Sequence, residues 1–92
     1  MSTDLKLTKV ISYLEAEFPG FTMTRTDGPQ GAVVLRLASS AKVHVVYVEK
    51  EFLESISIDD VQARITEYRL AATLRDVGEF PIVVSNNGCI FA

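Results

Sequence analysis

The sequence contains no tryptophan, a single histidine (His44) and a single cysteine (Cys89) in 92 residues. A lone cysteine cannot form a disulfide within the chain, and one histidine with one cysteine cannot supply the ligands of a zinc site. Small secreted domains usually carry several cysteines, so we expect a reducing compartment. No apolar run approaches the about 20 residues of a membrane span, and residues 1–9 lack the apolar segment of a signal peptide. We therefore expect a cytoplasmic protein with no membrane partner.

An excess of positive charge is also absent, since 9 Lys and Arg residues stand against 12 Asp and Glu residues, a net charge of -3. Proteins that neutralise phosphates usually present a basic surface, so nucleic acid is disfavoured as a partner. Apolar residues make up 48% of the chain, and we expect residues 1–92 to form one domain. A domain of this size buries only about 60 to 68% of its unfolded surface. A second subunit would add substantial burial, so we expect a homodimer.

Hydrophobic periodicity predicts two helices. Apolar residues at steps of three and four from Leu7 to Phe18 predict a helix that starts near residues 2–4, ends before Pro19 and exposes Lys6 on its opposite side.

The second helix is predicted by Ser57, which can cap the backbone, with Ile56 placed to contact Val61 across the first turn. It extends to Gly78, which is typical of the residue that follows a helix.

Alternation with a period of two, separated by turn residues, predicts five strands. The last two flank Asn-Gly, the strongest short signal for a hairpin. We expect an α+β fold in the order helix, three strands, helix, two strands, with an antiparallel sheet and both helices packed on one face. The strands are expected at 21–26, 32–38, 42–49, 82–85 and 89–91.

Catalytic motifs are scarce. The glycines stand at predicted turns and helix ends, no serine has a nucleophile-elbow context, and His44 with Cys89 is the one thiol and imidazole that could form a pair. A cysteine in a terminal strand is more typical of a small buried residue, and a histidine among valines of a sheet residue. We therefore assign no catalytic, cofactor or metal residues and expect a protein that is not an enzyme.

Acidic residues gather between the third strand and the second helix. They supply enough oxygen atoms for a magnesium or calcium site, but their spacing does not match an EF-hand loop. A solvated acidic surface is the simpler interpretation, and a small metal-dependent enzyme is the alternative. The acids are Glu49, Glu51, Glu54, Asp59 and Asp60.

Exposed apolar residues give a candidate interaction surface. Phe52 and Leu53 lie between the third strand and the second helix, flanked by acids. Ile90 and Phe91 lie in the last strand, which we expect to form an unprotected edge that pairs with another chain.

The predicted order of elements resembles the secretion chaperones of type III systems, which act as dimers that hold extended segments of client proteins. Its first six elements also resemble the core of the PD-(D/E)xK nucleases and, in part, double-stranded RNA-binding domains. The strand at 33–37 carries Arg36 and no acid, and Glu49-Lys50-Glu51 is not the acid-x-lysine triplet of the nucleases, so that resemblance implies an inactive, nucleic-acid-binding relative. Ser57 to Asp60 is acidic where RNA-binding domains would have lysines.

These observations favour a non-catalytic protein-protein interaction module that acts as a homodimer through an exposed strand edge and nearby aromatic residues. The alternatives are a small metal-dependent enzyme that uses the acids near 49–60 and an inactive nuclease-like nucleic-acid-binding domain. The sequence does not identify the protein partner.

Overall fold

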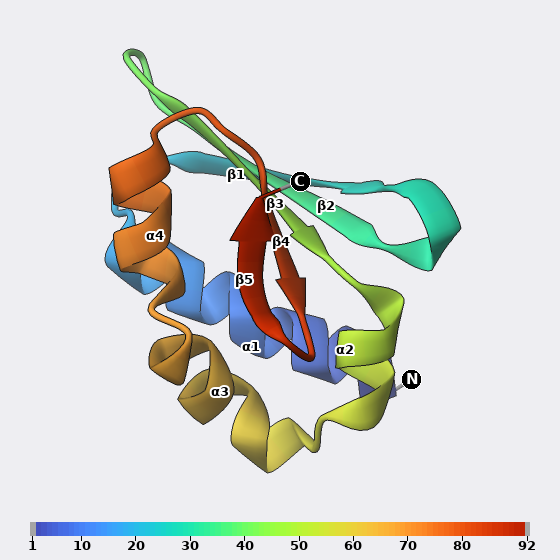
Figure 1. Ribbon diagram of the computed structural model, residues 1–92. Coiled ribbons are helices and arrows are strands. Elements are labelled where there is room, and N and C mark those ends of the chain that lie inside the picture. Colours follow the sequence, from blue (N-terminus) through green and yellow to red (C-terminus); the bar gives the residue numbers. More distant parts are fainter. Residues whose placement is uncertain (1, 92) are drawn as a thin grey trace.

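The computed structural model describes residues 2–91, and the side chains of residues 4–90. The chain forms a five-stranded sheet with helices on one of its faces (Figure 1). In chain order the elements are α1 (Ser2–Glu17), β1 (Thr22–Asp27), the 3-10 turn η1 (Pro29–Gly31), β2 (Val33–Ala38), β3 (Val43–Val48), α2 (Lys50–Ser55), the 3-10 turn η2 (Ile58–Asp60), α3 (Val61–Glu67), α4 (Leu70–Val77), β4 (Ile82–Ser85) and β5 (Gly88–Phe91).

The strands are ordered β1-β2-β3-β4-β5, as in the sequence, but the sheet is mixed. Our expectation of an antiparallel sheet is wrong for one pair, because β3 and β4 run parallel while the other neighbours are antiparallel. A parallel pair needs a crossover of a dozen or more residues, and residues 49–81 supply it through three helices. The α+β class is confirmed, and the chain is a mixed-sheet variant of it.

Within residues 2–91, four α-helices cover one face of the sheet, where we expected two. The first is confirmed, and its apolar stripe buries Leu7, Val10 and Leu14 against the sheet. Lys6, expected to be exposed, is buried, and its Nζ donates a hydrogen bond of 2.8 Å to the carbonyl oxygen of Leu53. That carbonyl is near the end of α2, where helical partners run out, so the lysine joins α1 to α2. No helix in the described part of the chain is long and apolar enough to cross a membrane.

The connection after β3 is a short helix, α2, and this corrects our expectation for Phe52 and Leu53. Both are core residues, with 0% and 3% of their surface exposed. They were expected at the surface because acids flank them. In a helix, however, neighbouring residues point in different directions, so Phe52 and Leu53 can face the core while the residues on either side face solvent. Glu51 and Glu54 face solvent while the two apolar side chains lie under the sheet. Phe52 and Leu53 therefore cannot form an interaction surface.

The second expected helix is broken into η2, α3 and α4. Ser57 caps no backbone group, and its hydroxyl instead donates a hydrogen bond of 2.9 Å to the Asp60 carboxylate. The break between α3 and α4 is at Arg69, which has the left-handed backbone conformation (φ 58°). It leaves N–H groups free at the start of α4, and the Tyr13 hydroxyl of α1 accepts one of them from Ala71 at 3.2 Å.

The core lies between the inner face of the sheet and the layer of helices. Apolar side chains from both layers form the cluster that fills this space. Its members are Leu7, Val10, Leu14, Phe18, Val33, Leu35, Leu37, Val46, Val48, Phe52, Leu53, Ile56, Val61, Ile65, Leu70, Ala71, Leu74, Ile82 and Val84.

Replacement of Phe52 by alanine tests its place in the core. We expect Phe52→Ala to lower the free energy of unfolding by about 3 to 5 kcal/mol, because it removes a buried ring and leaves a cavity. Phe80→Ala is the matched control, since Phe80 is 68% exposed. Its effect should stay within about 0.5 kcal/mol in urea unfolding. Equal effects of the two substitutions would contradict the burial of Phe52.

The left-handed residue between α3 and α4 gives a second prediction. The left-handed conformation costs a side-chain-bearing residue about 1 to 2 kcal/mol, whereas glycine adopts it freely. We expect Arg69→Gly to leave stability unchanged or to raise it by up to about 1 kcal/mol. Gln62→Gly, at an exposed position inside α3, should instead lower it by about 1 kcal/mol. Thermal unfolding distinguishes the two, and a similar loss at both positions would refute the argument.

Candidate interaction surface

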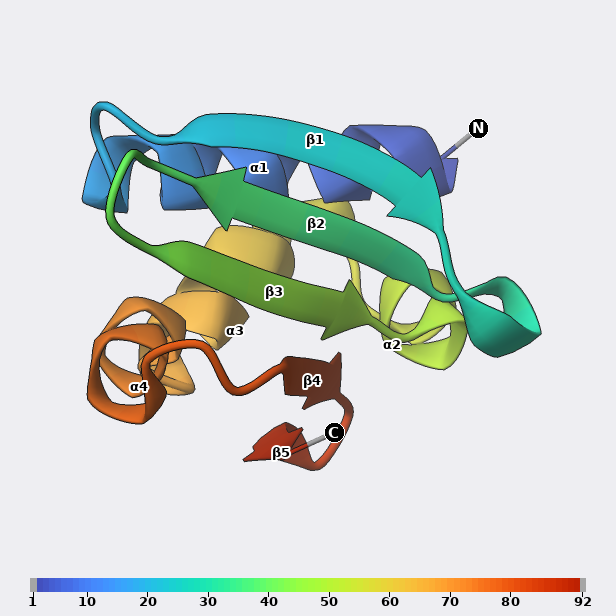
Figure 2. The ribbon, with the colours of Figure 1, turned by 90° about the horizontal axis from the view of Figure 1, so that it is seen from above.

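The face of the sheet opposite the helices is uncovered in the described part of the chain (Figure 2). Side chains alternate between the two faces of a strand, and in β2 and β3 the buried set faces the helices. The other set lies on the open face. The strand register aligns one of its side chains from each strand in a single row across the sheet, which we call the central row: Thr26, Val34, Tyr47, Val83 and Ile90.

Four of the five central-row residues are apolar or aromatic. Val34, Tyr47 and Val83 are partly exposed, and Ile90 is 50% exposed. An antiparallel sheet that meets water on one face usually alternates apolar and polar residues, so that the solvated face is polar. Here both faces of β3 are rich in valine, because Val43 and Val45 join Tyr47 on the open side. From β2 to β5 the open face is therefore mainly apolar, a patch that binding could cover.

One charged residue lies within this patch. Arg36 follows the central row by two residues along β2, beside Val45 of β3, and it is exposed. None of the ion pairs between described side chains includes it. The guanidinium therefore retains its full capacity to bind a carboxylate.

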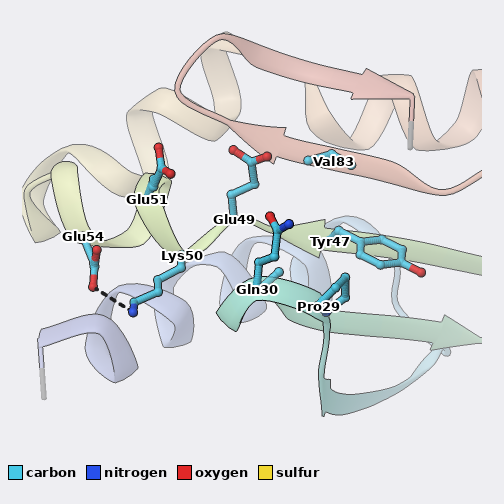
Figure 3. Close-up of a pocket in the computed structure, with 9 residues that line it drawn as sticks. Pro29, Gln30, Tyr47, Glu49, Lys50, Glu51, Glu54 and Val83 are labelled. Carbon is cyan, nitrogen blue, oxygen red and sulfur yellow. Dashed lines mark ion pairs between the residues drawn. The ribbon is translucent and has the colours of Figure 1, made fainter.

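A hollow of about 470 Å³ lies at the other end of the open face, between η1 and α2 (Figure 3). Three carboxylates and one ammonium group line it. Lys50 pairs with Glu54 at 3.9 Å, while the carboxylates of Glu49 and Glu51 point away from that pair. Tyr47 and Val83 belong both to the hollow and to the central row, so the two features are continuous. The lining is Pro29, Gln30, Ala32, Tyr47, Glu49, Lys50, Glu51, Glu54 and Val83.

Of the three candidate-surface residues whose side chains the structure describes, Ile90 lies on the open face. Phe52 and Leu53 lie in the core on the other side of the sheet. The side chain of Phe91 lies outside the described residues. The remaining open-face residues were missed, although the signal was present in the valines that occupy both alternating positions of β3.

His44 and Cys89 are not brought together. Cys89 of β5 lies opposite Val84 of β4, and Val84 lies opposite Val48 of β3. His44 is four residues from Val48 along β3. Four residues span about 13 Å and two strand spacings about 10 Å, so the side chains are on the order of 16 Å apart. His44 is buried, its Nδ1 donates to the carbonyl oxygen of Gly78 at 2.8 Å, and its ring lies 5.2 Å from that of Phe18. It connects β3 to the end of α4.

The acids of the alternative, metal-dependent interpretation are also divided. Glu49, Glu51 and Glu54 border the hollow, whereas Asp59 and Asp60 belong to η2. Nowhere in the described residues do three His, Cys, Asp or Glu side chains gather closely enough to hold a metal ion.

Comparisons with known proteins found no matching family model, no matching curated protein and no matching solved structure. The resemblances named above therefore depend on the order of elements alone.

The thiol of Cys89 offers a test of this packing. Burial raises its pKa from 9.0 to about 11, because the thiolate is poorly solvated between the sheet and the helices. At pH 8 the folded protein should therefore contain about 100-fold less thiolate than an unshifted thiol and react with iodoacetamide correspondingly slowly. The rate should rise with pH up to about 11. The raised pKa stabilises the fold below pH 9, and this contribution is lost as the pH rises from 9 to 11.

The urea-unfolded chain is the control for this reaction, since its thiol is solvated and should react at the ordinary rate. Similar rates for the folded and unfolded chains at pH 8 would show that Cys89 is not shielded.

Proposed function

We propose that the chain is a non-catalytic protein-protein interaction module that acts as a homodimer in the cytoplasm. The apolar open face of the sheet is the observation that carries this proposal. Contiguous apolar patches on small proteins usually mark interaction sites. Removing apolar surface from water lowers the free energy by roughly 25 cal/mol per Å². The free thiol of Cys89 suits a reducing compartment.

The lack of assembled chemical groups supports a binding role. The two side chains most suited to nucleophilic chemistry, His44 and Cys89, are separated, and the thiol is protonated at neutral pH. The side chain of the buried His44 already donates a hydrogen bond to the carbonyl oxygen of Gly78. The proposed module accordingly needs no cofactor.

A strand edge provides the second possible route to a dimer. Of the two edge strands, β1 carries Arg25 and Asp27, and such charges discourage pairing with another chain. The sequence Gly88–Phe91 of β5 has no charge. A four-residue strand offers few hydrogen bonds and little area, however, so we expect the open face to contribute most of the interface.

Sedimentation equilibrium between 5 μM and 1 mM should detect the dimer. We expect Val45→Lys to shift the protein to a monomer, because it places an ammonium group in the apolar face. Leu5→Lys is the matched control, since Leu5 is 60% exposed on α1, and it should leave the dimer intact. A wild-type protein that stays monomeric at 1 mM would refute the homodimer, and a dimer that survives Val45→Lys would refute the open face as its interface.

A further inference from the structure

We infer that two copies pack open face against open face about a two-fold axis along the central row, so that Arg36 of each copy enters the acidic hollow of the other. This inference deepens the proposed function, because it specifies how the homodimer is built. Its occupant is a second copy of this chain, and three features of the open face lead to it.

The first feature is the placement of opposite charges on either side of the central row. Arg36 lies two residues beyond Val34 along β2, while Glu49 lies two residues beyond Tyr47 along β3, at the opposite end of the face. A two-fold rotation about the row exchanges these ends. Arg36 of one copy then lies over Ala32 of the other. Measured along the plane of the sheet, this position is one strand spacing, about 4.8 Å, from Glu49.

The second feature is the lining of the hollow. Glu49 and Glu51 have no ion-pair partner among the described side chains, and Arg36 has none either. Arginine and carboxylate form bidentate hydrogen bonds, and the Tyr47 ring at the wall suits a guanidinium. Packed sheets lie about 10 Å apart, a gap that the long arginine side chain crosses.

The third feature is that a two-fold axis parallel to the strands lacks this complementarity. A two-fold axis parallel to the strands keeps Arg36 at the same end of the face as Arg36 of the other copy. Like charges then approach one another and both hollows stay empty. The two-fold axis along the central row also places Tyr47 against Tyr47 and Val34 against Val34, which buries the apolar centre.

The size of the face sets the expected strength. Three strands of six residues and two of four, spaced by about 4.8 Å, give a projected area of about 400 Å². This is below the about 800 Å² per partner of a standard interface. We therefore expect a dissociation constant in the micromolar range. In so small an interface the two ion pairs between copies decide whether the dimer forms.

Charge reversal tests the arrangement directly. Arg36→Glu places a carboxylate in the acidic hollow, and Glu49→Arg with Glu51→Arg places Arg36 in a basic one. Each variant alone should dimerise at least 10-fold more weakly than the wild type. In an equimolar mixture both contacts become attractive, so sedimentation equilibrium and native mass spectrometry should show a heterodimer at concentrations where each variant alone is monomeric.

The controls reverse charges on the helical side of the molecule. Lys9→Glu and Glu15→Arg change exposed residues of α1, and both should dimerise like the wild type. Circular dichroism verifies that every variant is folded, and Glu51→Arg alone replaces the double variant if the latter unfolds.

The results separate this inference from the proposed function. A wild-type dimer that Arg36→Glu leaves unchanged, or a mixture of variants that stays monomeric, would overturn the arrangement while the homodimer stands. A wild-type monomer at 1 mM would overturn both.

Discussion

Burial of one face of the sheet against four helices is the constraint on which the rest of the structure depends. Valine and leucine side chains of β2, β3 and β4 meet the stripe of α1 and the apolar residues of α2, α3 and α4. This contact fixes which residues of each strand point inward, and a shift of one residue would exchange the two faces. It also keeps Lys6 and His44, two polar residues of the interior, at positions where a backbone carbonyl accepts their hydrogen bonds.

The same one-sided burial leaves the opposite face of the sheet with its own character. Side chains there do not pack in the core, and the solvated face of a sheet normally carries polar side chains. The chain instead has Val34, Val45, Tyr47 and Val83 on this side, with Arg36 and Glu49 as charged residues at its two ends. An apolar surface of this kind is stable in water mainly when a partner covers it, which connects the fold to the proposed function.

Much of the fold could be predicted from local sequence patterns. The first helix, the five strands and the final hairpin follow from periodicity and turn residues, because those signals act within a few residues. The break at Arg69 could not be predicted, since an arginine rarely adopts the left-handed conformation and no glycine marks the position. The parallel pairing of β3 with β4 could not be predicted either, because the direction of β4 depends on where the three helices before it place its first residue.

The candidate surface shows the same division. The acids around Phe52 suggested exposure, yet α2 turns its two apolar residues inward and leaves the acids at the rim of the hollow. By itself the sequence determined the class of fold, the first helix, the five strands and the excess of acid over base, because composition and short-range periodicity carry that information. Only the tertiary structure decided which valines are core and which are surface, and that Arg36 and Glu49 lie at opposite ends of one face. Those relations are set by strand register, which joins residues distant in the chain.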